Sequence, residues 1–480
     1  MFLGIDVGTS GVKAVIVAAS GSVLAQATVP LAVSRPHPLW SEQDANDWWT
    51  ATENAVLSLD PKLRSGVLGI GIAGQMHGAT LLDANDKPLR PAILWNDGRS
   101  FAECEGLEKT EPRARAITGN IAMPGFTAPK LAWVRQHEPD IFAQVQTVLL
   151  PKDYVRLCMT GDKASDMADS AGTLWLDVTK RCWSAEMLAA CGLSEGQMPK
   201  LFEGSAATGQ LSAAVAARWG MTAVPVAAGG GDNAAGAVGV GVVGDGDALL
   251  SLGTSGVIFV ATKDFRPNPA RAVHAFCHAL PDMWHQMSVH LSAASCIDWA
   301  AQLAGIDGPA AFFALAEAAG PAAGPELFLP YLSGERTPHN DPHVRGAFLG
   351  LGNETGPGQL AAAVLEGVAF AHADGLDALR EAGTQVEELA VIGGGARSAY
   401  WGRIIAASLG VRLVYLEGGE VGPALGAARL AQIAVTGGSV AEICTRPPVS
   451  HIIEPDAALA DALALKRARF RAAYPLISQI

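Results

Sequence analysis

The chain has 480 residues, of which 49% are hydrophobic and 17% charged, and this composition excludes a wholly disordered protein. The length is too great for one ordinary hydrophobic core and predicts about two or three domains. The net charge of −13, without any Lys- or Arg-rich run, argues against nucleic acid or an anionic membrane as a partner.

The N-terminal segment predicts a β-hairpin. Residues 2–7 form an apolar run, residues 8–11 read Gly-Thr-Ser-Gly, and residues 12–19 (VKAVIVAA) are rich in β-branched side chains. Two such runs around a short glycine-containing turn are typical of antiparallel strands. We therefore expect a strand, a tight turn and a second strand in this order.

Helical and strand-like stretches alternate after this hairpin. Residues 41–59 (SEQDANDWWTATENAVLSL) predict a helix with Ser41 as its N-cap. Residues 67–74 (VLGIGIAG) and 147–154 (TVLLPKDY) predict strands. This alternation indicates an α/β fold.

The hairpin pattern returns in the second half of the chain. Residues 248–262 (ALLSLGTSGVIFVAT) repeat the strand, the Gly-Thr-Ser-Gly turn and the strand, 245 positions after the first copy. A repeat of about half the chain predicts two similar domains, residues 1–245 and 246–480. The Gly- and Asp-rich residues 243–248 predict the boundary between them and a hinge.

A pair of such turns suits the binding of a phosphate chain. Each turn offers backbone N–H groups and hydroxyls that approach closely without a side-chain clash. Facing each other across a cleft, they would hold a nucleotide triphosphate, with Asp6 at a strand end where a Mg²⁺-bound water is held. One copy alone is also explained as ordinary turn chemistry, whereas two copies in matched contexts favour phosphate. The sequence contains no P-loop motif.

Residues 225–241 (PVAAGGGDNAAGAVGVG) predict a strand, a glycine triplet and a helix that opens with Asp232. One interpretation is that Asp232 caps the helix. The other is that Asp232 is a catalytic base, since glycines at 229–231 leave room for a substrate. In that case we expect the helix dipole to lower the pKa of Asp232, and a weak base suffices for a loose phosphoryl-transfer transition state.

Three further segments have weaker patterns. Residues 389–410 (LAVIGGGARSAYWGRIIAASLG) predict a strand, a glycine turn and a helix, which suits either an adenosine site or tight strand–helix packing. Residues 420–431 (EVGPALGAARLA) predict a closely packed helix. Residues 333–343 (SGERTPHNDPH) match no zinc or EF-hand spacing and predict a rigid loop with a Glu335–Arg336 ion pair.

The cellular compartment is predicted from cysteines and apolar runs. Seven cysteines without paired short spacing argue against a disulfide framework or a zinc site and predict thiols in a reducing compartment. Asp6 interrupts the first apolar run, so we expect no signal peptide. No stretch approaches about 18 uninterrupted apolar residues. We therefore expect a cytoplasmic protein.

Taken in order, these motifs resemble the FGGY family of carbohydrate kinases, within the actin, Hsp70 and sugar-kinase superfamily. The resemblance implies an α/β fold with two duplicated actin/Hsp70-like (ribonuclease H-like) domains and a nucleotide and sugar cleft between them. It covers essentially the whole chain, through GIDVGTSGVKAV, GIGIAGQMHGATLLD, AILWNDGRS, GGGDNAAGAVG, LSLGTSGV, FLPYLSGERTPHNDPHVRGAFLGL, VIGGGARSAYW and GPALGAARLA.

Two stretches point to a substrate within that family. Residues 74–78 (GQMHG) and 93–99 (ILWNDGR) are similar to those of xylulose-phosphorylating members, whereas glycerol-phosphorylating members have Arg-Glu in place of Met76-His77. The resemblance implies ATP- and Mg²⁺-dependent phosphorylation of the terminal hydroxyl of D-xylulose to D-xylulose 5-phosphate, in xylose catabolism.

The resemblance also implies roles for individual residues. Asp232 would be the base, and Asp6 a second acidic group, both near Mg²⁺ through water or phosphate. The sugar would contact Met76, His77, Trp95 and Asn233. The nucleotide would contact Gly8, Thr9, Ser10, Lys13, Gly253, Thr254, Gly393, Gly394, Gly395 and Ser398. Many family members have Asn in place of Ser398. On sequence alone His77 is more often a structural histidine, and the resemblance overturns that interpretation.

Several alternatives remain at this level. The substrate could be ribulose, gluconate or glycerol, or the chain could be a nucleotide-dependent switch like actin or Hsp70. A DNA-binding regulator is disfavoured because the first hairpin starts at once and leaves no room for a helix-turn-helix. The expected partners are D-xylulose and ATP, with neither nucleic acid nor membrane, and the resemblance implies a homodimer.

Overall fold

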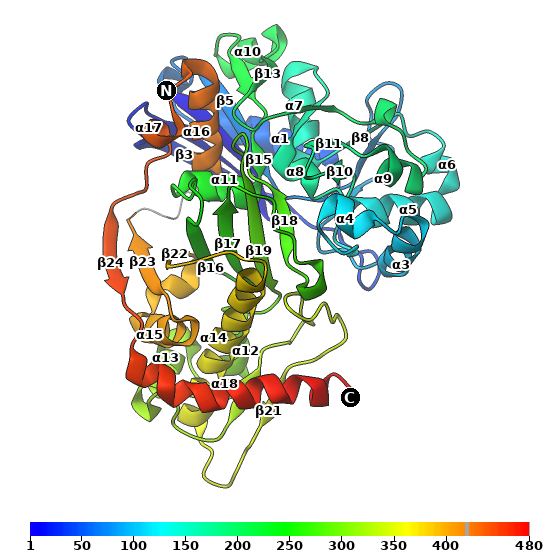
Figure 1. Cartoon of the computed structure of the whole chain (residues 1–480). Coiled ribbons are helices and arrows are strands. Elements are labelled where there is room, and N and C mark those ends of the chain that lie inside the picture. The colour runs from blue at the N-terminus through cyan, green and yellow to red at the C-terminus, as the bar shows by residue number, and fades with distance from the viewer. Residues whose placement is uncertain (418–421, 480) are drawn as a thin grey trace.

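The computed structural model describes residues 1–417 and 422–479 and contains two large mixed sheets, one above the other (Figure 1). The first sheet has the spatial order β13 (Ala207–Gln210), β14 (Pro225–Ala227), β5 (Gly69–Gly74), β1 (Phe2–Val7), β2 (Gly11–Val17) and β3 (Val23–Pro30), with β15 (Gly230–Gly231) beside β5. The second has the order β18 (His274–Cys277), β19 (Trp284–His290), β17 (Gly256–Thr262), β16 (Ala248–Leu252), β22 (Glu388–Ile392), β23 (Arg412–Leu416) and β24 (Val449–Ile453).

The two sheets share the same arrangement of five core strands. In each, an antiparallel hairpin (β1–β2, β16–β17) continues into a third antiparallel strand. On its other side the first hairpin strand pairs in parallel with β5 or β22, which in turn pairs in parallel with β14 or β23. The predicted hairpins and the duplicated α/β architecture are therefore confirmed.

Helices cover both sheets, and short strand pairs lie at the periphery. The helices of the first half are α1 (Ala45–Leu57), α2 (Pro61–Arg64), α3 (Phe101–Thr110), α4 (Ala114–Thr118), α5 (Thr127–His137), α6 (Pro139–Phe142), α7 (Pro151–Thr160), α8 (Met167–Ala171), α9 (Ala185–Ala190), α10 (Ala213–Trp219) and α11 (Asp232–Gly239). Those of the second half are α12 (Ser295–Leu303), α13 (Gly308–Ala319), α14 (Pro357–Glu381), α15 (Ala399–Leu409), α16 (Gly422–Thr436), α17 (Val440–Ile443) and α18 (Ala457–Ile477). The peripheral strands are β4 (Glu42–Gln43), β6 (Thr80–Leu82), β7 (Ala92–Ile93), β8 (Thr147–Leu149), β9 (Ala164–Asp166), β10 (Leu176–Asp177), β11 (Cys182–Trp183), β12 (Lys200–Phe202), β20 (Leu327–Leu329) and β21 (Ala347–Leu349). Within the described ranges, no helix is both long enough and apolar enough to span a bilayer.

Two local predictions were wrong. The N-cap of α1 is Asp44, whose side chain accepts a hydrogen bond from the Asn46 amide, and Ser41 lies before β4. The segment 147–154 is a strand only as far as Leu149, because Pro151 occupies the first position of α7, where its fixed φ suits a helix.

Helix α16 belongs to the second half of the chain but packs on the first sheet (Figure 1). Its small residues lie directly against strand backbone: a Cβ added at Gly71 of β5 would lie 1.8 Å from the Ala427 carbonyl oxygen. On another side of the helix, a Cβ at Gly426 would lie 1.7 Å from the Ala235 carbonyl oxygen of α11. The helix is therefore closely packed, as predicted, while the domain boundary at residue 245 stays a prediction.

Replacing Gly71 with alanine is expected to destabilise the protein by about 1–3 kcal/mol or more, because neither backbone can retreat from the added methyl group. Urea unfolding followed by circular dichroism measures the difference. The matched control is Gly106→Ala, since Gly106 lies in α3 with nothing within 4 Å of the new methyl group. An unchanged midpoint for Gly71→Ala would show that α16 sits farther from the sheet.

Candidate active site

Asp6 lies at the end of β1, where the first sheet meets α11. Lys13 of β2 is its cross-strand neighbour, and Ala73 of β5 its neighbour on the other side. Burial and the nearby charge of Asp232 raise the pKa of Asp6 to about 7, while Lys13 opposes this shift. One carboxyl oxygen of Asp6, Oδ1, is buried without a hydrogen-bond partner in the described part of the chain. This end of the sheet therefore presents a carboxyl group with unused acceptor capacity.

Asp232 is the first residue of α11, and Gly231 occupies the cap position. The Asp232 Oδ1 accepts hydrogen bonds from the Asn233 backbone N (2.7 Å) and side-chain Nδ2 (2.9 Å). Burial raises the pKa of Asp232 to about 6 against the effect of these two bonds. The predicted lowering of this pKa was therefore wrong, because the desolvation of a buried carboxylate outweighs the helix terminus. The result is a carboxylate that is ionised at neutral pH and more basic than an ordinary aspartate.

Glycines bring Met76 close to Asp232. A Cβ at Gly231 would lie 2.7 Å from the Met76 Cγ, so the thioether packs directly on the backbone beside Asp232. A Cβ at Gly172, the residue after α8, would lie 2.5 Å from the His77 Cε1 and 2.9 Å from the Met76 Cε. The room that we expected the triplet to provide is therefore occupied, at Gly231, by Met76.

His77 is held as a neutral imidazole. Its backbone is left-handed, with φ of 69°, and Nδ1 lies 2.7 Å from the Gly172 carbonyl oxygen, to which it must donate. Burial and the neighbouring Lys130 lower the pKa of His77 to about 3. The Nε2 atom is thus left without a proton and can accept a hydrogen bond from a hydroxyl group.

Trp95 and Thr9 are joined by a hydrogen bond. The indole Nε1 of Trp95 donates to the Thr9 Oγ1 at 3.0 Å. This contact links a residue predicted for the sugar to one predicted for the nucleotide. With Met76 packed on Gly231, both sets of residues meet at the same end of the first sheet.

A cavity of about 800 Å³ lies between the two sheets. Lys13 of the first sheet lines it together with Ser251, Gly393, Gly394 and Tyr415 of the second half. Three predicted nucleotide residues from both halves therefore share one cavity.

The rest of the predicted nucleotide set lies outside this lining. It comprises Gly8, Thr9, Ser10, Gly253, Thr254, Gly395 and Ser398. The hydroxyl of Ser398 caps α15 by accepting a hydrogen bond from the Trp401 amide at 3.2 Å. A Cβ at Gly395 would lie 2.7 Å from the Trp401 ring, so this glycine serves strand–helix packing.

The predicted Glu335–Arg336 ion pair was wrong. Glu335 instead lies 3.2 Å from the His290 Nδ1 and accepts a hydrogen bond from the Leu291 amide. The Arg336 Nη1 lies 3.5 Å from the Nε2 of His274, in β18 of the second sheet. The charge of Arg336 contributes to the low pKa of His77. Arg336 therefore lies near the candidate site, whereas the local sequence predicted only that it pairs with the adjacent Glu335.

A buried ionic cluster lies beneath the site. Lys152 is fully buried, and its Nζ lies 2.6 Å from Asp153, 2.7 Å from Asp166 and 3.6 Å from Asp169. Burial raises the pKa of Asp169 well above its usual range, and the charge of Asp232 adds to this effect. The cluster therefore holds one ammonium among three carboxyl groups next to α11.

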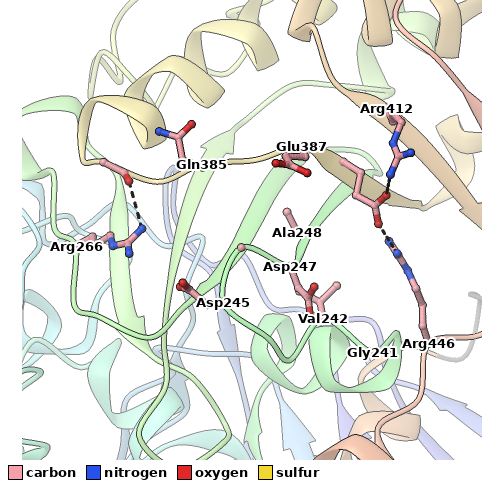
Figure 2. A pocket seen from close by; sticks show the side chains of 13 residues that line it. Gly241, Val242, Asp245, Asp247, Ala248, Arg266, Gln385, Glu387, Arg412 and Arg446 are labelled. Atoms are coloured by element: carbon pink, nitrogen blue, oxygen red, sulfur yellow. Dashed lines mark hydrogen bonds and ion pairs between the residues drawn. The ribbon is translucent and has the colours of Figure 1, made fainter.

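A second cavity, of about 570 Å³, lies at the linker between the halves. Its lining includes Asp245, Asp247, Arg266, Arg412 and Arg446, and none of the predicted site residues. Figure 2 shows Arg412 and Arg446 directed at one carboxylate, that of Glu388, which pairs with both. Asp247 accepts hydrogen bonds from backbone N–H groups of the linker itself. Because these charged side chains are paired with neighbouring groups, we interpret the cavity as a cleft formed by the linker.

Comparisons with known proteins show the family to which the chain belongs. The model of the FGGY family of carbohydrate kinases, N-terminal domain, matches residues 1–239, and that of the C-terminal domain matches residues 248–435. The chain therefore belongs to the FGGY family of carbohydrate kinases and has the two-domain fold of that family.

Individual relatives show which members of the family the chain resembles in sequence and structure. The chain is 57% identical to the xylulose kinase of Escherichia coli K12 over 99% of its own length and 98% of that protein. It is 58% identical to the xylulose kinase of Klebsiella pneumoniae, with 91% and 90% covered. The crystal structure of a xyloylose kinase from Brucella ovis superimposes with a TM-score of 0.95 at 53% identity, and 99% of each chain is covered.

Proposed function

We propose that this carbohydrate kinase transfers the γ-phosphoryl group of ATP to the terminal hydroxyl of D-xylulose, giving D-xylulose 5-phosphate and ADP in xylose catabolism. The observation that carries the proposal is the joint placement of Met76, neutral His77 and the basic carboxylate of Asp232 around Gly231. The xylulose kinases to which the chain is 57–58% identical support the choice of sugar.

The chemistry follows from the protonation states. Asp232 accepts the proton of the sugar hydroxyl while that oxygen bonds to the γ-phosphorus and the bond to the ADP oxygen breaks. Asn233 orients the carboxylate through its two hydrogen bonds. The His77 Nε2 accepts a hydrogen bond from another sugar hydroxyl, and Met76 and Trp95 supply an apolar wall.

The residues present fit a Mg²⁺ ion. Asp6 has a buried carboxyl oxygen without a hydrogen-bond partner among the described residues, and its pKa responds to the charge of Asp232. Mg²⁺ takes oxygen ligands and is commonly held by one or two carboxylates plus substrate phosphates. In the described residues, no group of three or more His, Cys, Asp or Glu side chains could hold a metal ion unaided. Asp6 and Asp232 would thus hold the ion through water or phosphate, where it neutralises phosphate charge.

The reaction rate is expected to rise with pH as these carboxyl groups ionise. With pKa values of about 6 for Asp232 and about 7 for Asp6, kcat/KM should level off above about pH 7, fall roughly tenfold per pH unit between about 7 and 6, and fall roughly a hundredfold per pH unit below about 6, where both groups are protonated. Steady-state kinetics between pH 5 and pH 9, with stability checked at each pH, measure the profile. A midpoint near 4, the value of an ordinary carboxyl group, would contradict the elevated pKa values.

The test of the function is ADP release with D-xylulose, D-ribulose, glycerol and gluconate in parallel. Selective turnover of D-xylulose is the expected result. Turnover of another sugar of the panel would keep the kinase mechanism and reject the Met76–His77 argument. ATP-dependent structural change without any phosphorylated sugar would favour the nucleotide switch.

Three further proposals concern the whole molecule. Closure of the two halves at the linker, over sugar in the first and MgATP mainly on the second, predicts compaction in solution scattering with sugar and a non-hydrolysable nucleotide. The homodimer stays a prediction, which light scattering during gel filtration tests. The cytoplasmic location likewise stays a prediction.

A further inference from the structure

A closed ring of hydrogen bonds joins the first Gly-Thr-Ser-Gly turn to the predicted sugar wall. The Thr9 hydroxyl bonds to the Gln75 Oε1 at 2.8 Å, the Gln75 Nε2 to the Gln43 Oε1 at 2.9 Å, and the Gln43 Nε2 to the Thr9 carbonyl oxygen at 2.8 Å. Gln75 directly precedes Met76, and both glutamine side chains are buried. The ring therefore lies between the phosphate turn and the Met76–His77 segment.

The chemistry of the partners fixes every donor in this ring. The carbonyl oxygens of Thr9 and Ala32 only accept, so Gln43 must direct its NH₂ group at them. Its Oε1 then accepts from the Trp48 indole and from Gln75, which leaves the Gln75 Oε1 facing Thr9. No amide in the ring can be reversed without setting two donors or two acceptors against each other.

The hydroxyl of Thr9 therefore has no proton to offer a phosphate. Its single proton is donated to the buried Gln75 oxygen, and one of its lone pairs accepts from the Trp95 indole. Phosphate oxygens at neutral pH accept hydrogen bonds, so they need a donor. In the second turn, by contrast, the exposed Thr254 side chain has no hydrogen-bond partner among the described residues. The Thr9 hydroxyl is thus hydrogen-bonded to two side chains, whereas the Thr254 side chain has no hydrogen-bond partner among the described residues.

We propose that Thr9, Gln75 and Gln43 are positioning residues that couple sugar binding to the phosphate turn. A sugar packed on Trp95 and Met76 fixes Gln75 and Thr9, and through them the backbone N–H groups that receive the phosphate chain. The proposal rests on the proposed kinase function and gives the Thr9 side chain a role other than phosphate ligand. By linkage, the sugar should raise nucleotide affinity by the same factor as the nucleotide raises sugar affinity.

The experiment measures that factor. Titration calorimetry gives the dissociation constant of a Mg²⁺-bound, non-hydrolysable ATP analogue with and without saturating sugar, for the parent, Thr9→Val, Gln75→Met and Thr9→Ser. Couplings of this kind are commonly about 5- to 150-fold. We expect the parent and Thr9→Ser to fall in that range, and Thr9→Val and Gln75→Met to fall below about twofold.

Thr254→Val is the matched control, because its hydroxyl is outside the ring. It should weaken the analogue while the coupling factor stays at the parental value. If Thr9→Val instead weakens the analogue equally with and without sugar, or changes nothing, the Thr9 side chain is not the link and the proposal fails. The absence of coupling in the parent also overturns it.

The sugar used is whichever member of the panel the parent phosphorylates. A wrong identity for the sugar therefore leaves this experiment intact. Gln75→Met preserves the length of the side chain, so it tests the ring even where Thr9→Val folds poorly.

Discussion

Replacing Asp232 with asparagine is expected to lower kcat for sugar phosphorylation by about 10²–10⁴-fold, the usual contribution of a positioned general base. Asparagine keeps the size of the side chain and can still accept the hydrogen bonds from Asn233, but it cannot take the hydroxyl proton. Coupled ADP release gives kcat, and calorimetry shows whether sugar binding persists. Asp461→Asn on the exposed face of α18 is the control. A loss below tenfold would remove Asp232 from the role of base.

The same substitution should stabilise the folded protein at neutral pH. The folded-state pKa of Asp232, about 6, lies above the ordinary 3.8, so folding favours the protonated form. The resulting penalty is absent below about pH 4, grows between pH 4 and pH 6 and is constant above, at roughly 2–3 kcal/mol. Thermal unfolding at pH 8 should therefore show a higher Tm for Asp232→Asn, and the gain should disappear near pH 4. A lower Tm at pH 8 would contradict the desolvated carboxylate.

Replacing Lys152 with methionine is expected to destabilise the protein by about 3–5 kcal/mol, because it leaves three buried carboxyl groups without their ammonium partner. The loss should shrink as the pH falls, since the raised pKa values of Asp166 and Asp169 allow these groups to become neutral. Urea unfolding at pH 5 and pH 8 measures both effects.

Lys180→Met is the matched control for this experiment. Lys180 pairs with Asp177, but its side chain is 74% exposed. Such a surface pair contributes at most about 1 kcal/mol. Equal losses in the two variants would mean that the Lys152 cluster is no more important than a surface ion pair.

Local sequence patterns predicted the elements whose signals are local. The apolar runs around both Gly-Thr-Ser-Gly turns define β1, β2, β16 and β17. The first glycine triplet precedes α11, and the second begins η3 (Gly394–Arg397), which precedes α15. Ser41 failed as a cap because Glu42 and Gln43 pair with β7, about fifty residues later in the chain. The residues immediately around Ser41 contain no signal of a partner so distant in the sequence.

The residues of the candidate site divide in the same way, into those with a local sequence signal and those positioned by distant contacts. Asp232, Met76 and His77 were recognisable from their glycine-rich surroundings and from the family resemblance, and the structure places them together. The contacts of Arg336 and the Thr9–Gln75–Gln43 ring were not predicted, because each joins residues 32 or more positions apart. The predicted direction of the shift in the Asp232 pKa was wrong, since the burial that controls this pKa arises only from the assembled fold.

The position of α16 also sets the order in which the molecule can be completed during synthesis. Helix α11 ends at Gly239 and α16 at Thr436, about 200 residues later. At roughly 5–20 residues per second, a ribosome needs about 10–40 s to make that interval. Throughout it, the apolar strip of Phe2, Val15 and Val17 has no α16 to cover it. The nascent first half thus exposes an apolar surface until the chain is nearly finished. This partly synthesised form is the one on which chaperones would act.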